Sequence, residues 1–260
     1  MNAVIADTPT HGVRRLRLNI PERLNALDDH VKSALLTHLA AAADDLEVRA
    51  VLITGVGRAF CAGGDVQKMG ARVPTETVDV LVHGRRLPEL IMGMQTPVVA
   101  AVNGAASGAG FNLALACDIV LAHQSAWFQQ SFVRLGLIPD LGGSYLLARQ
   151  VGLNRAKEIL LTGRRIESAE AQQLGIVAAV FADDFDKRAV EYAGELAKGP
   201  TRALGLTKLL TNRAVESSIQ AALDREMLAQ GVASSTSDHR AAVEAFKNKH
   251  RLETVEFVGE

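Results

Sequence analysis

The stretch NGAASGAGFNLALACD, residues 103–118, decides the fold more than any other part of the sequence. It follows the apolar run VVAAV at residues 98–102 and passes from small residues into a short apolar segment. This order predicts a buried strand, a loop over residues 103–110 and a helix over residues 111–117. Residues 119–122 are apolar again and predict a further strand. Strands, loops and helices in this order indicate an α/β core.

A second glycine-rich segment, RAFCAGGDVQKM at residues 58–69, also follows an apolar run, AVLIT at residues 50–54. Small residues let a backbone approach a ligand closely, and a loop that leads into a helix presents free N–H groups. Two such loops can aim two N–H groups at one oxygen, which is the geometry of an oxyanion hole. Tight turns with close strand–helix packing produce the same pattern, so the residues alone leave both interpretations open.

The segments around these loops have clear periodicities. Residues 11–20, HGVRRLRLNI, alternate apolar and polar side chains, which predicts a strand with one polar face. Asp28 can cap a helix that runs to about Asp45. From about Asp183 onward the pattern is helical. The final stretch of roughly sixty residues is too thin to bury itself, so we expect it to pack on the core or on another subunit.

The composition narrows the class of protein. The chain has 260 residues, 48% hydrophobic and 22% charged, so it can bury a sizeable core and is not expected to be disordered. Its length allows one large domain or two small ones. Lysine plus arginine is 28 and aspartate plus glutamate is 29, for a net charge of -1. We therefore expect no nucleic-acid partner, although a local basic pocket for a small anion remains possible.

Other features bear on the cellular compartment. Cys61 and Cys117 stand far apart in apolar surroundings, which predicts buried free thiols in a reducing compartment. The N-terminus has no secretory pattern. Residues 90–117 carry no charge, but Pro97 and several glycines and asparagines interrupt them, so we expect a buried core segment and no membrane span. Together these features predict a cytoplasmic protein.

Common catalytic motifs do not match. The sequence contains no Walker loop, and residues 104–110 do not fit the dinucleotide pattern G-x-G-x-x-G. Ser107, in GAASG, misses the nucleophile pattern G-x-S-x-G by one position. The 7 histidines include no close pair with metal-ligand spacing. The two glycine-rich segments therefore remain the best candidates for chemistry.

These two segments closely resemble the enoyl-CoA hydratase/isomerase (crotonase) superfamily, through F-C-A-G-G-D-V-x-K-M and N-G-x-A-x-G-x-G-x-x-L-x-L-A-C-D. PERLNAL at residues 21–27 is similar to the family's substrate-edge loop. FVRLGLIPDLGGSYLL at residues 132–147 is similar to its third active-site segment, and AQQLGIV at residues 171–177 to a structural segment. The resemblance covers nearly the whole chain in the family's order.

The resemblance implies an α/β fold, a crotonase-like spiral of ββα repeats with a C-terminal helical trimerisation region. It divides the chain into a spiral core with the CoA-thioester site, residues 1–198, and a C-terminal helical region, residues 199–260. It also implies an acyl-CoA thioester as substrate and a homotrimer or dimer of trimers as the assembly. Coenzyme A is then part of the substrate, and no further cofactor or metal is implied.

The family stabilises an enolate formed from the thioester. Matched by position, Gly64 supplies the first oxyanion N–H and Ala109 the second, where the family usually has glycine. Classical hydratases carry two glutamates that handle the attacking water, and here Asn112 and Phe132 occupy those positions. Neither side chain transfers protons under ordinary conditions. Asp140 matches the carboxylate of several isomerases, among them enoyl-CoA isomerases and ring-opening isomerases of epoxidised phenylacetyl-CoA.

The remaining site residues also come from the resemblance. Apolar neighbours such as Phe132, Leu137 and Ile138 are expected to raise the pKa of Asp140. The alternative is that Asp140 has no catalytic role and only shapes a turn or caps a helix. The basic tail FKNKHR, residues 246–251, can reach a neighbour's CoA site. The substrate-binding residues implied by the resemblance are Arg23, Ala26, Ala62, Asp65, Val66, Lys68, Asn112, Phe132 and Lys249.

Three functional hypotheses follow. The first, which the missing glutamates favour, is an enoyl-CoA isomerase in which Gly64 and Ala109 hold the enolate oxygen and Asp140 shuttles one proton. The second is an enoyl-CoA hydratase with a non-standard base, using water held by Asn112 or Asp140. The third is a non-catalytic acyl-CoA binding protein.

Overall fold

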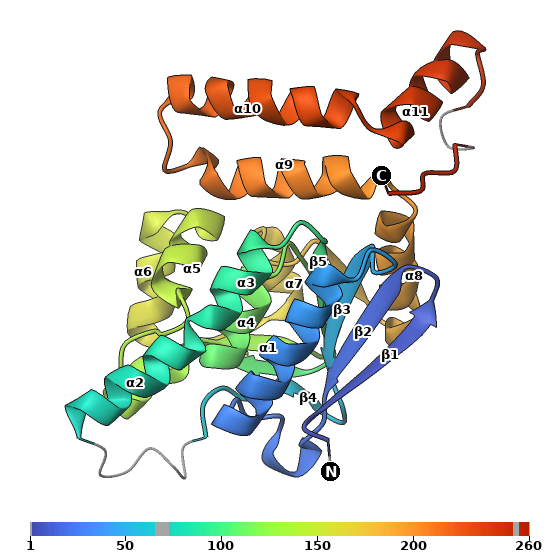
Figure 1. The fold of residues 1–260 in the computed structure, drawn as a ribbon. Helices are drawn as coiled ribbons and strands as arrows, with labels where there is room; N and C mark the ends of the chain where they lie inside the picture. Colours follow the sequence, from blue (N-terminus) through green and yellow to red (C-terminus); the bar gives the residue numbers. More distant parts are fainter. Residues whose placement is uncertain (1, 66–72, 252–254, 260) are drawn as a thin grey trace.

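The computed structural model describes residues 2–65, 73–251 and 255–259. Over these residues the strands form a six-stranded sheet, in the order β1-β2-β3-β5-β7-β10, and a four-stranded sheet, β4-β6-β8-β9 (Figure 1). The strands are Val4–Thr10 (β1), Val13–Leu18 (β2), Ala50–Gly55 (β3), Ala59–Cys61 (β4), Val98–Val102 (β5), Ala105–Ser107 (β6), Ile119–His123 (β7), Trp127–Gln129 (β8), Arg165–Glu167 (β9) and Ala179–Phe181 (β10). The α-helices are Asp29–Asp44 (α1), Pro74–Gly84 (α2), Arg86–Gly93 (α3), Ala109–Ala116 (α4), Gly143–Val151 (α5), Leu153–Thr162 (α6), Ser168–Gln173 (α7), Phe185–Ala197 (α8), Thr201–Ala214 (α9), Ile219–Ser234 (α10) and Ser237–Lys247 (α11). Short 3-10 helices span Pro21–Arg23 and Ser131–Leu135.

A repeated ββα unit builds both sheets. In the successive pairs β3–β4, β5–β6 and β7–β8, the first strand joins the larger sheet and the second joins the smaller one. Neighbouring repeats pair in parallel in both sheets, as β3·β5·β7 and as β4·β6·β8. A helix follows β6 directly, and a 3-10 turn followed by α5 comes after β8. The predicted α/β spiral of ββα repeats is therefore confirmed.

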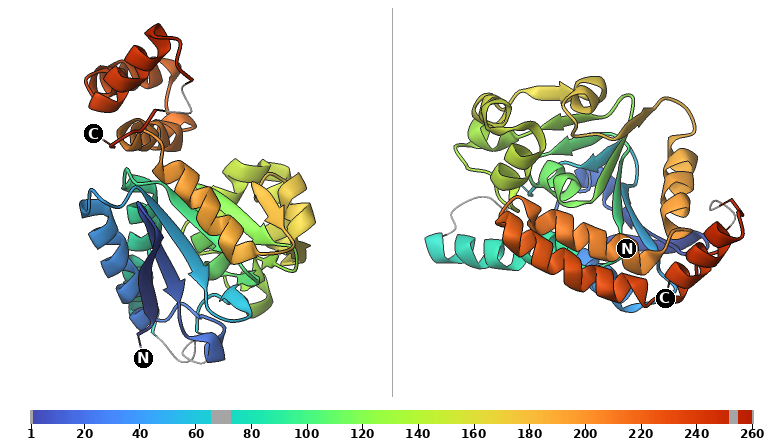
Figure 2. Two further views of the ribbon diagram at one scale, coloured as in Figure 1. Left: turned by 90° about the vertical axis from the view of Figure 1, so that its right-hand side faces the viewer. Right: turned by 90° about the horizontal axis from the view of Figure 1, so that it is seen from above.

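The central strands β3, β5 and β7 of the larger sheet are buried on both faces, which explains their continuous apolar sequences. In β3, Val51 and Ile53 face a core cluster shared with α1, whereas Ala50 and Leu52 face a second cluster shared with α8. Helices α1 and α8 accordingly lie on opposite sides of this sheet (Figure 2). Successive side chains of a strand point to opposite faces of the sheet. Because both faces are buried at β3, a polar side chain at any of these positions would be taken out of water.

Most of the expected elements are present. Asp28 caps α1, because its carboxylate accepts a hydrogen bond of 2.9 Å from the Val31 amide. The strands expected at residues 50–54, 98–102 and 119–122 match β3, β5 and β7 closely. Helical structure begins at Phe185, close to the expected Asp183, and continues through α11.

The expectation of one continuous loop over residues 103–110 was wrong. Residues Ala105–Ser107 form β6, and α4 begins at Ala109 rather than at residue 111. β6 consists of small residues with low strand propensity, and it is a strand because β4 and β8 flank it and supply hydrogen-bond partners. The sequence also missed β1, whose residues alternate poorly and which pairs with β2 in a hairpin.

The C-terminal helices α9 and α10 form a layer beside the core (Figures 1 and 2). Lys208 anchors α9, because its ammonium lies 2.8 Å from the Asp118 carboxylate and donates to the Thr96 carbonyl at 3.1 Å. Helix α10 has no buried residue and exposes Ile219, Leu223 and other large apolar side chains. The division expected between residues 198 and 199 falls between α8 and α9.

Both cysteines are buried free thiols, as predicted. Burial raises the pKa of the Cys61 thiol to about 12, so it stays protonated at neutral pH. Within the described ranges, no helix is both long and apolar enough to cross a lipid bilayer. The same residues contain no cluster of three or more histidine, cysteine or acidic side chains placed to hold a metal ion.

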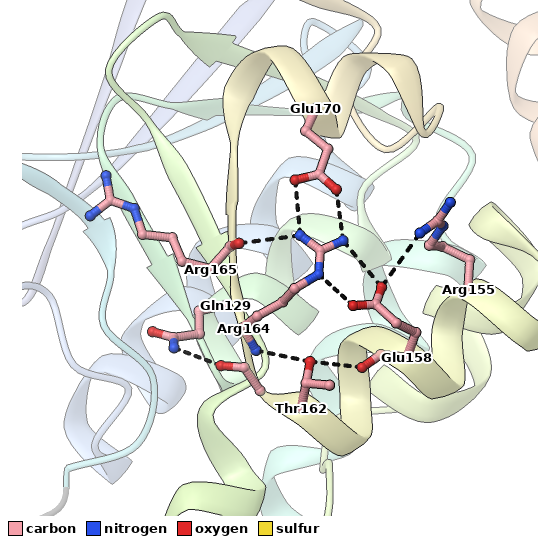
Figure 3. A network of polar contacts seen from close by, with 8 residues as sticks. Gln129, Arg155, Glu158, Thr162, Arg164, Arg165 and Glu170 are labelled. Carbon is pink, nitrogen blue, oxygen red and sulfur yellow. Dashed lines mark hydrogen bonds and ion pairs between the residues drawn. The ribbon is translucent and has the colours of Figure 1, made fainter.

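An ion-pair network joins α6, β9 and α7 (Figure 3). The Arg164 guanidinium lies between two carboxylates, 2.5 Å from Glu158 and 2.6 Å from Glu170. Next to it, the Gln129 side chain donates a 2.7 Å hydrogen bond to the Gly163 carbonyl. Hydrogen bonds from Arg164 lower the pKa of both Glu158 and Glu170.

We expect Arg164→Ala to lower the free energy of unfolding by about 1 kcal/mol, at the upper end for exposed ion pairs. The pKa values of both carboxyls are lowered in the folded state. The network therefore stabilises the folded protein at pH values above about 4.3, the pKa of an unfolded glutamate, and this stabilisation is lost as the pH falls through the lowered pKa values. The Tm difference between variant and parent, measured by calorimetry, should be largest near neutral pH and vanish in acid. Lys198→Ala, which removes a single exposed pair, is the control. A difference independent of pH would exclude the network as its source.

Candidate active site

The parallel pairing of β4 with β6 brings the two glycine-rich segments together. Gly64 lies three residues beyond the end of β4, and Ala109 lies two residues beyond the end of β6. Both positions therefore follow adjacent strands at the same edge of the smaller sheet. A side-chain carbon placed on Gly63 would lie 3.4 Å from the Ala109 amide nitrogen, so the two segments are in contact.

Only glycine fits at position 63. Its φ of +95° lies in the left-handed region, and an added Cβ would lie 2.7 Å from the Ser107 carbonyl oxygen. The two glycine-rich segments therefore pack closely at this position, which is the tight packing that the residues alone left open. That the segments also approach a ligand stays a prediction.

Ala109 opens α4, and this location determines what its amide can do. The first N–H groups of a helix have no intrahelical acceptor and form the positive end of the helix dipole. The preceding residue, Gly108, is held by a 2.8 Å hydrogen bond from its amide to the Gln129 carbonyl. The Ala109 amide is thus fixed at the start of a helix, which suits it to an anionic oxygen.

The substrate-edge loop packs against the first glycine-rich segment. The Ala62 amide donates to the Leu24 carbonyl at 2.9 Å, and the Leu27 amide donates to the Gly63 carbonyl at 2.7 Å. Two of the expected substrate-binding residues, Ala26 and Ala62, therefore lie on adjacent hydrogen-bonded segments. Ala26 is buried and Ala62 is partly exposed.

Arg23 joins this loop to the residue that follows Gly64. Its guanidinium lies 2.7 Å from the Asp28 carboxylate and 2.9 Å from the Asp65 carboxylate. The family resemblance implies that Arg23 binds substrate, and here its charge is paired with two acids. The geometry therefore assigns Arg23 and Asp65 first to holding the loop in position.

The other expected substrate contacts lie elsewhere. Val66 and Lys68 fall outside the described residues. Lys249 lies just beyond α11, on the side of the molecule where the C-terminal helices lie, and α4 lies in the core (Figures 1 and 2). One copy of the chain therefore does not bring Lys249 together with the two glycine-rich segments.

Asp140 lies three residues before the first residue of α5 and is partly buried. Its Oδ1 is buried and has no hydrogen-bond partner among the described residues. Burial raises the pKa of the carboxyl, and the positive charge of Lys32 and a hydrogen bond from Asn112 offset part of that rise. A desolvated carboxylate oxygen without a donor is well suited to accept a proton.

Of the three apolar side chains expected around the carboxyl, Phe132 is buried, whereas Leu137 and Ile138 are 44% and 83% exposed. The positive charge of Lys32 is a further influence on the carboxyl. Lys32 was not identified from the sequence, because the helical pattern of α1 says nothing about where a lysine side chain ends. Its side chain is 9% exposed and pairs with Asp29 at 2.8 Å.

The two positions of the hydratase glutamates hold buried side chains. Asn112 is fully buried, and its amide donates to the Asp140 carbonyl at 2.9 Å and accepts from Gln130 at 2.7 Å. Phe132 is 8% exposed, and its ring lies within 4 Å of the point where a Cβ on Gly108 would be. Neither arrangement supplies a group that can carry a proton to or from water.

The site thus combines two backbone segments suited to stabilise an oxyanion with one carboxylate suited to move a proton. Gln130 is a further participant that the sequence did not identify, since a glutamine in WFQQS carries no motif. Its burial, at 1% exposed, follows from the packing of β8 against α4 and is visible only in the folded chain.

Comparisons with known proteins bear on this arrangement. The sequence model of the enoyl-CoA hydratase/isomerase family matches residues 8–254. A probable enoyl-CoA hydratase of Rhodobacter capsulatus is 39% identical over 92% of this chain and 93% of its own length. The 1,2-epoxyphenylacetyl-CoA isomerase of Escherichia coli K12 is 38% identical over the same shares. The crystal structure of an enoyl-CoA hydratase from Bacillus anthracis superposes with a TM-score of 0.93 at 31% identity, covering 99% of this chain and 100% of that one.

The family match, the relatives and the solved structure agree with the spiral fold. The crotonase-like fold expected from the sequence is therefore confirmed. The chain belongs to the enoyl-CoA hydratase/isomerase family, whose members act on coenzyme A thioesters.

Proposed function

We propose that this chain is an enoyl-CoA isomerase that moves a carbon–carbon double bond toward the thioester by shuttling one proton on Asp140. The observation that carries the proposal is the contrast between one available carboxylate and two unusable hydratase positions. Asp140 has a buried oxygen to which none of the described residues donates, whereas Asn112 and Phe132 are buried side chains that do not transfer protons.

The amides of Gly64 and Ala109 are proposed to hold the thioester oxygen. A proton next to a thioester is weakly acidic, so the barrier depends on the charge that develops on that oxygen. Each well-aimed donor contributes on the order of 3 kcal/mol to stabilising such a charge. The contact between Gly63 and the start of α4 supports this role, because it sets the two segments side by side.

The proton then moves in two steps. The Asp140 carboxylate removes a proton from C2 of a 3-enoyl thioester, and the electron pair of that C–H bond delocalises over the diene and the thioester oxygen. The protonated carboxyl returns the same proton to C4, which leaves the double bond between C2 and C3. The carboxylate is regenerated, no water is consumed, and no cofactor beyond the substrate's coenzyme A takes part.

The names of the relatives support both activities. A probable hydratase and an isomerase are similar to this chain at 39% and 38% identity, so overall similarity does not distinguish the two reactions. Hydration needs groups that hold a water molecule and deliver its proton. The Asn112 amide is fully buried and occupied by Asp140 and Gln130, which favours isomerisation over a hydratase that holds water at Asn112.

We also propose that residues 199–260 form an assembly region and that the protein is a trimer or a dimer of trimers in the cytoplasm. Helix α10 supports this, because a row of large apolar side chains on it is exposed in the single chain. In such an assembly the basic tail around Lys249 would reach the CoA phosphates bound by an adjacent copy. Ala26 and Ala62 would border the thioester end of the substrate.

Asp140→Asn should lower the turnover of a 3-enoyl-CoA by about a hundred- to ten-thousandfold, since the amide cannot accept the proton. Affinity for a saturated acyl-CoA should stay nearly unchanged. Conjugated-thioester absorbance measures the turnover, and calorimetric titration measures the affinity.

Asp186→Asn, on the opposite side of the larger sheet, is the matched control. Full activity of Asp140→Asn would rule out Asp140 as the base, and loss of absorbance from a 2-enoyl-CoA would show hydration instead.

The pH profile should report the Asp140 carboxyl. Only the ionised form accepts a proton, so kcat/KM should fall as the pH drops through a pKa above the ordinary aspartate value of about 3.9. Lys32→Met removes a positive charge that favours the ionised form, and should move this fall to higher pH. Lys198→Met, at an exposed lysine, should not. An unmoved profile in Lys32→Met would contradict the electrostatic coupling of Lys32 to Asp140.

Leu223→Glu should weaken the assembly, because it places a charge within the apolar row of α10. Sedimentation velocity should show the parent as a trimer or hexamer and the variant shifted toward smaller species. Gln172→Glu adds the same charge on exposed α7 and should leave the sedimentation profile unchanged. A monomeric parent protein would refute the proposed assembly.

A further inference from the structure

A short chain of buried amides leads to the proposed base. Gln130, 1% exposed, directly follows β8, and its Nε2 donates to the Asn112 Oδ1 at 2.7 Å. Asn112, fully buried in α4, donates from its Nδ2 to the backbone carbonyl of Asp140 at 2.9 Å. These hydrogen-bonded amides thus connect three segments of the site that are separate in sequence.

The polarity of this chain follows from hydrogen-bond chemistry. A backbone carbonyl can only accept, so Asn112 must present its NH2 group to Asp140. The Asn112 oxygen then faces Gln130, which must present its own NH2 group in turn. Reversing either amide would place two acceptors or two donors face to face. The hydrogen bonds therefore run in one direction, from Gln130 through Asn112 to Asp140.

The backbone at Asp140 is held from a second side. The Gly143 amide donates to the same Asp140 carbonyl at 2.8 Å, at the start of α5. Gly143 also packs directly on the Asn112 amide, because an added Cβ would lie 2.2 Å from the Asn112 Oδ1. Two donors thus fix the Asp140 peptide, and the space around the Asn112 side chain is filled.

We propose that Asn112 and Gln130 are positioning residues that orient Asp140 for proton transfer. Asn112 would hold the Asp140 backbone, and Gln130 would hold Asn112 in the orientation that permits this. The inference rests on the proposed role of Asp140 as the base. It also explains why the position of a hydratase glutamate holds an asparagine: in this chain the residue there fixes another acid instead of acting on water.

The packing around Asn112 leaves no room for the glutamate that a hydratase carries at this position. A glutamate at position 112 is longer than asparagine, and α5 already packs against the asparagine amide. Asn112→Glu would therefore displace Gly143 or the Asp140 peptide. We expect this variant to lose isomerase activity without gaining hydratase activity, which would be seen as no loss of absorbance from a 2-enoyl-CoA.

The direct test is Gln130→Met, which keeps the length of the side chain but removes the donor. We expect kcat for the 3-enoyl-CoA to fall on the order of ten- to a hundredfold, with KM nearly unchanged, since a misplaced catalytic group affects the chemical step. The acidic limb of the pH profile should move to higher pH. Burial raises the pKa of Asp140, and the Asn112 amide opposes this rise at the carboxyl as well as donating to the Asp140 backbone carbonyl. An Asn112 amide that Gln130 no longer holds should oppose the rise less.

Gln150→Met is the matched control. Gln150, near the end of α5, also donates a hydrogen bond of 2.6 Å to a backbone carbonyl, but that carbonyl belongs to Gly175. Its loss should lower Tm as Gln130→Met does while leaving kcat and the pH limb unchanged. If Gln130→Met does not fold, Asn112→Asp provides a second test, because an ionised carboxylate cannot donate to the Asp140 carbonyl.

The outcomes separate the two proposals. A Gln130→Met or Asn112→Asp enzyme with parental kcat and pH limb, together with an inactive Asp140→Asn, would overturn the positioning role and leave the proposed function standing. An active Asp140→Asn would overturn the proposed function itself. Reduced kcat with unchanged KM in Gln130→Met, and parental kinetics in Gln150→Met, would support the positioning role.

Discussion

The parallel pairing of two short strands, β4 and β6, is the constraint on which the site depends. Each strand ends in a segment of small residues, and the pairing places the two segments against each other at one sheet edge. In the proposed reaction, the backbone amides of these segments stabilise the thioester oxygen without the cost of burying a charged side chain. Because only the N–H group is needed, alanine at position 109 can serve where the family usually has glycine.

A stabilised enolate is common chemistry that several reactions can use. The specific reaction is then set by the few side chains that can move protons near the thioester. In this chain the Asp140 carboxyl is partly desolvated, and the Asn112 amide donates to the Asp140 backbone carbonyl. Relatives of nearly equal similarity carry hydratase and isomerase names, so overall identity does not determine which reaction a member catalyses.

The rest of the fold supports that edge. The larger sheet is covered on both faces, which makes it a rigid base for the smaller sheet and for α4. Arg23 ties the substrate-edge loop to Asp65, and Lys208 ties α9 to the core through Asp118. Helix α10 leaves an apolar row exposed, so the surface of the single chain is suited to contact further copies of itself.

The sequence by itself determined the family, the α/β class, the buried strands and the two glycine-rich segments, because burial on both faces and close backbone approach each restrict residue type locally. It could not show that residues 105–107 form a strand, since those small residues pair only when β4 and β8 lie beside them. Nor could it show that Arg23 is paired, that Lys32 influences Asp140, or that Gln130 and Asn112 form a directed chain. These facts depend on where long side chains end and on which buried polar groups meet, and only the packing of elements far apart in the sequence decides that.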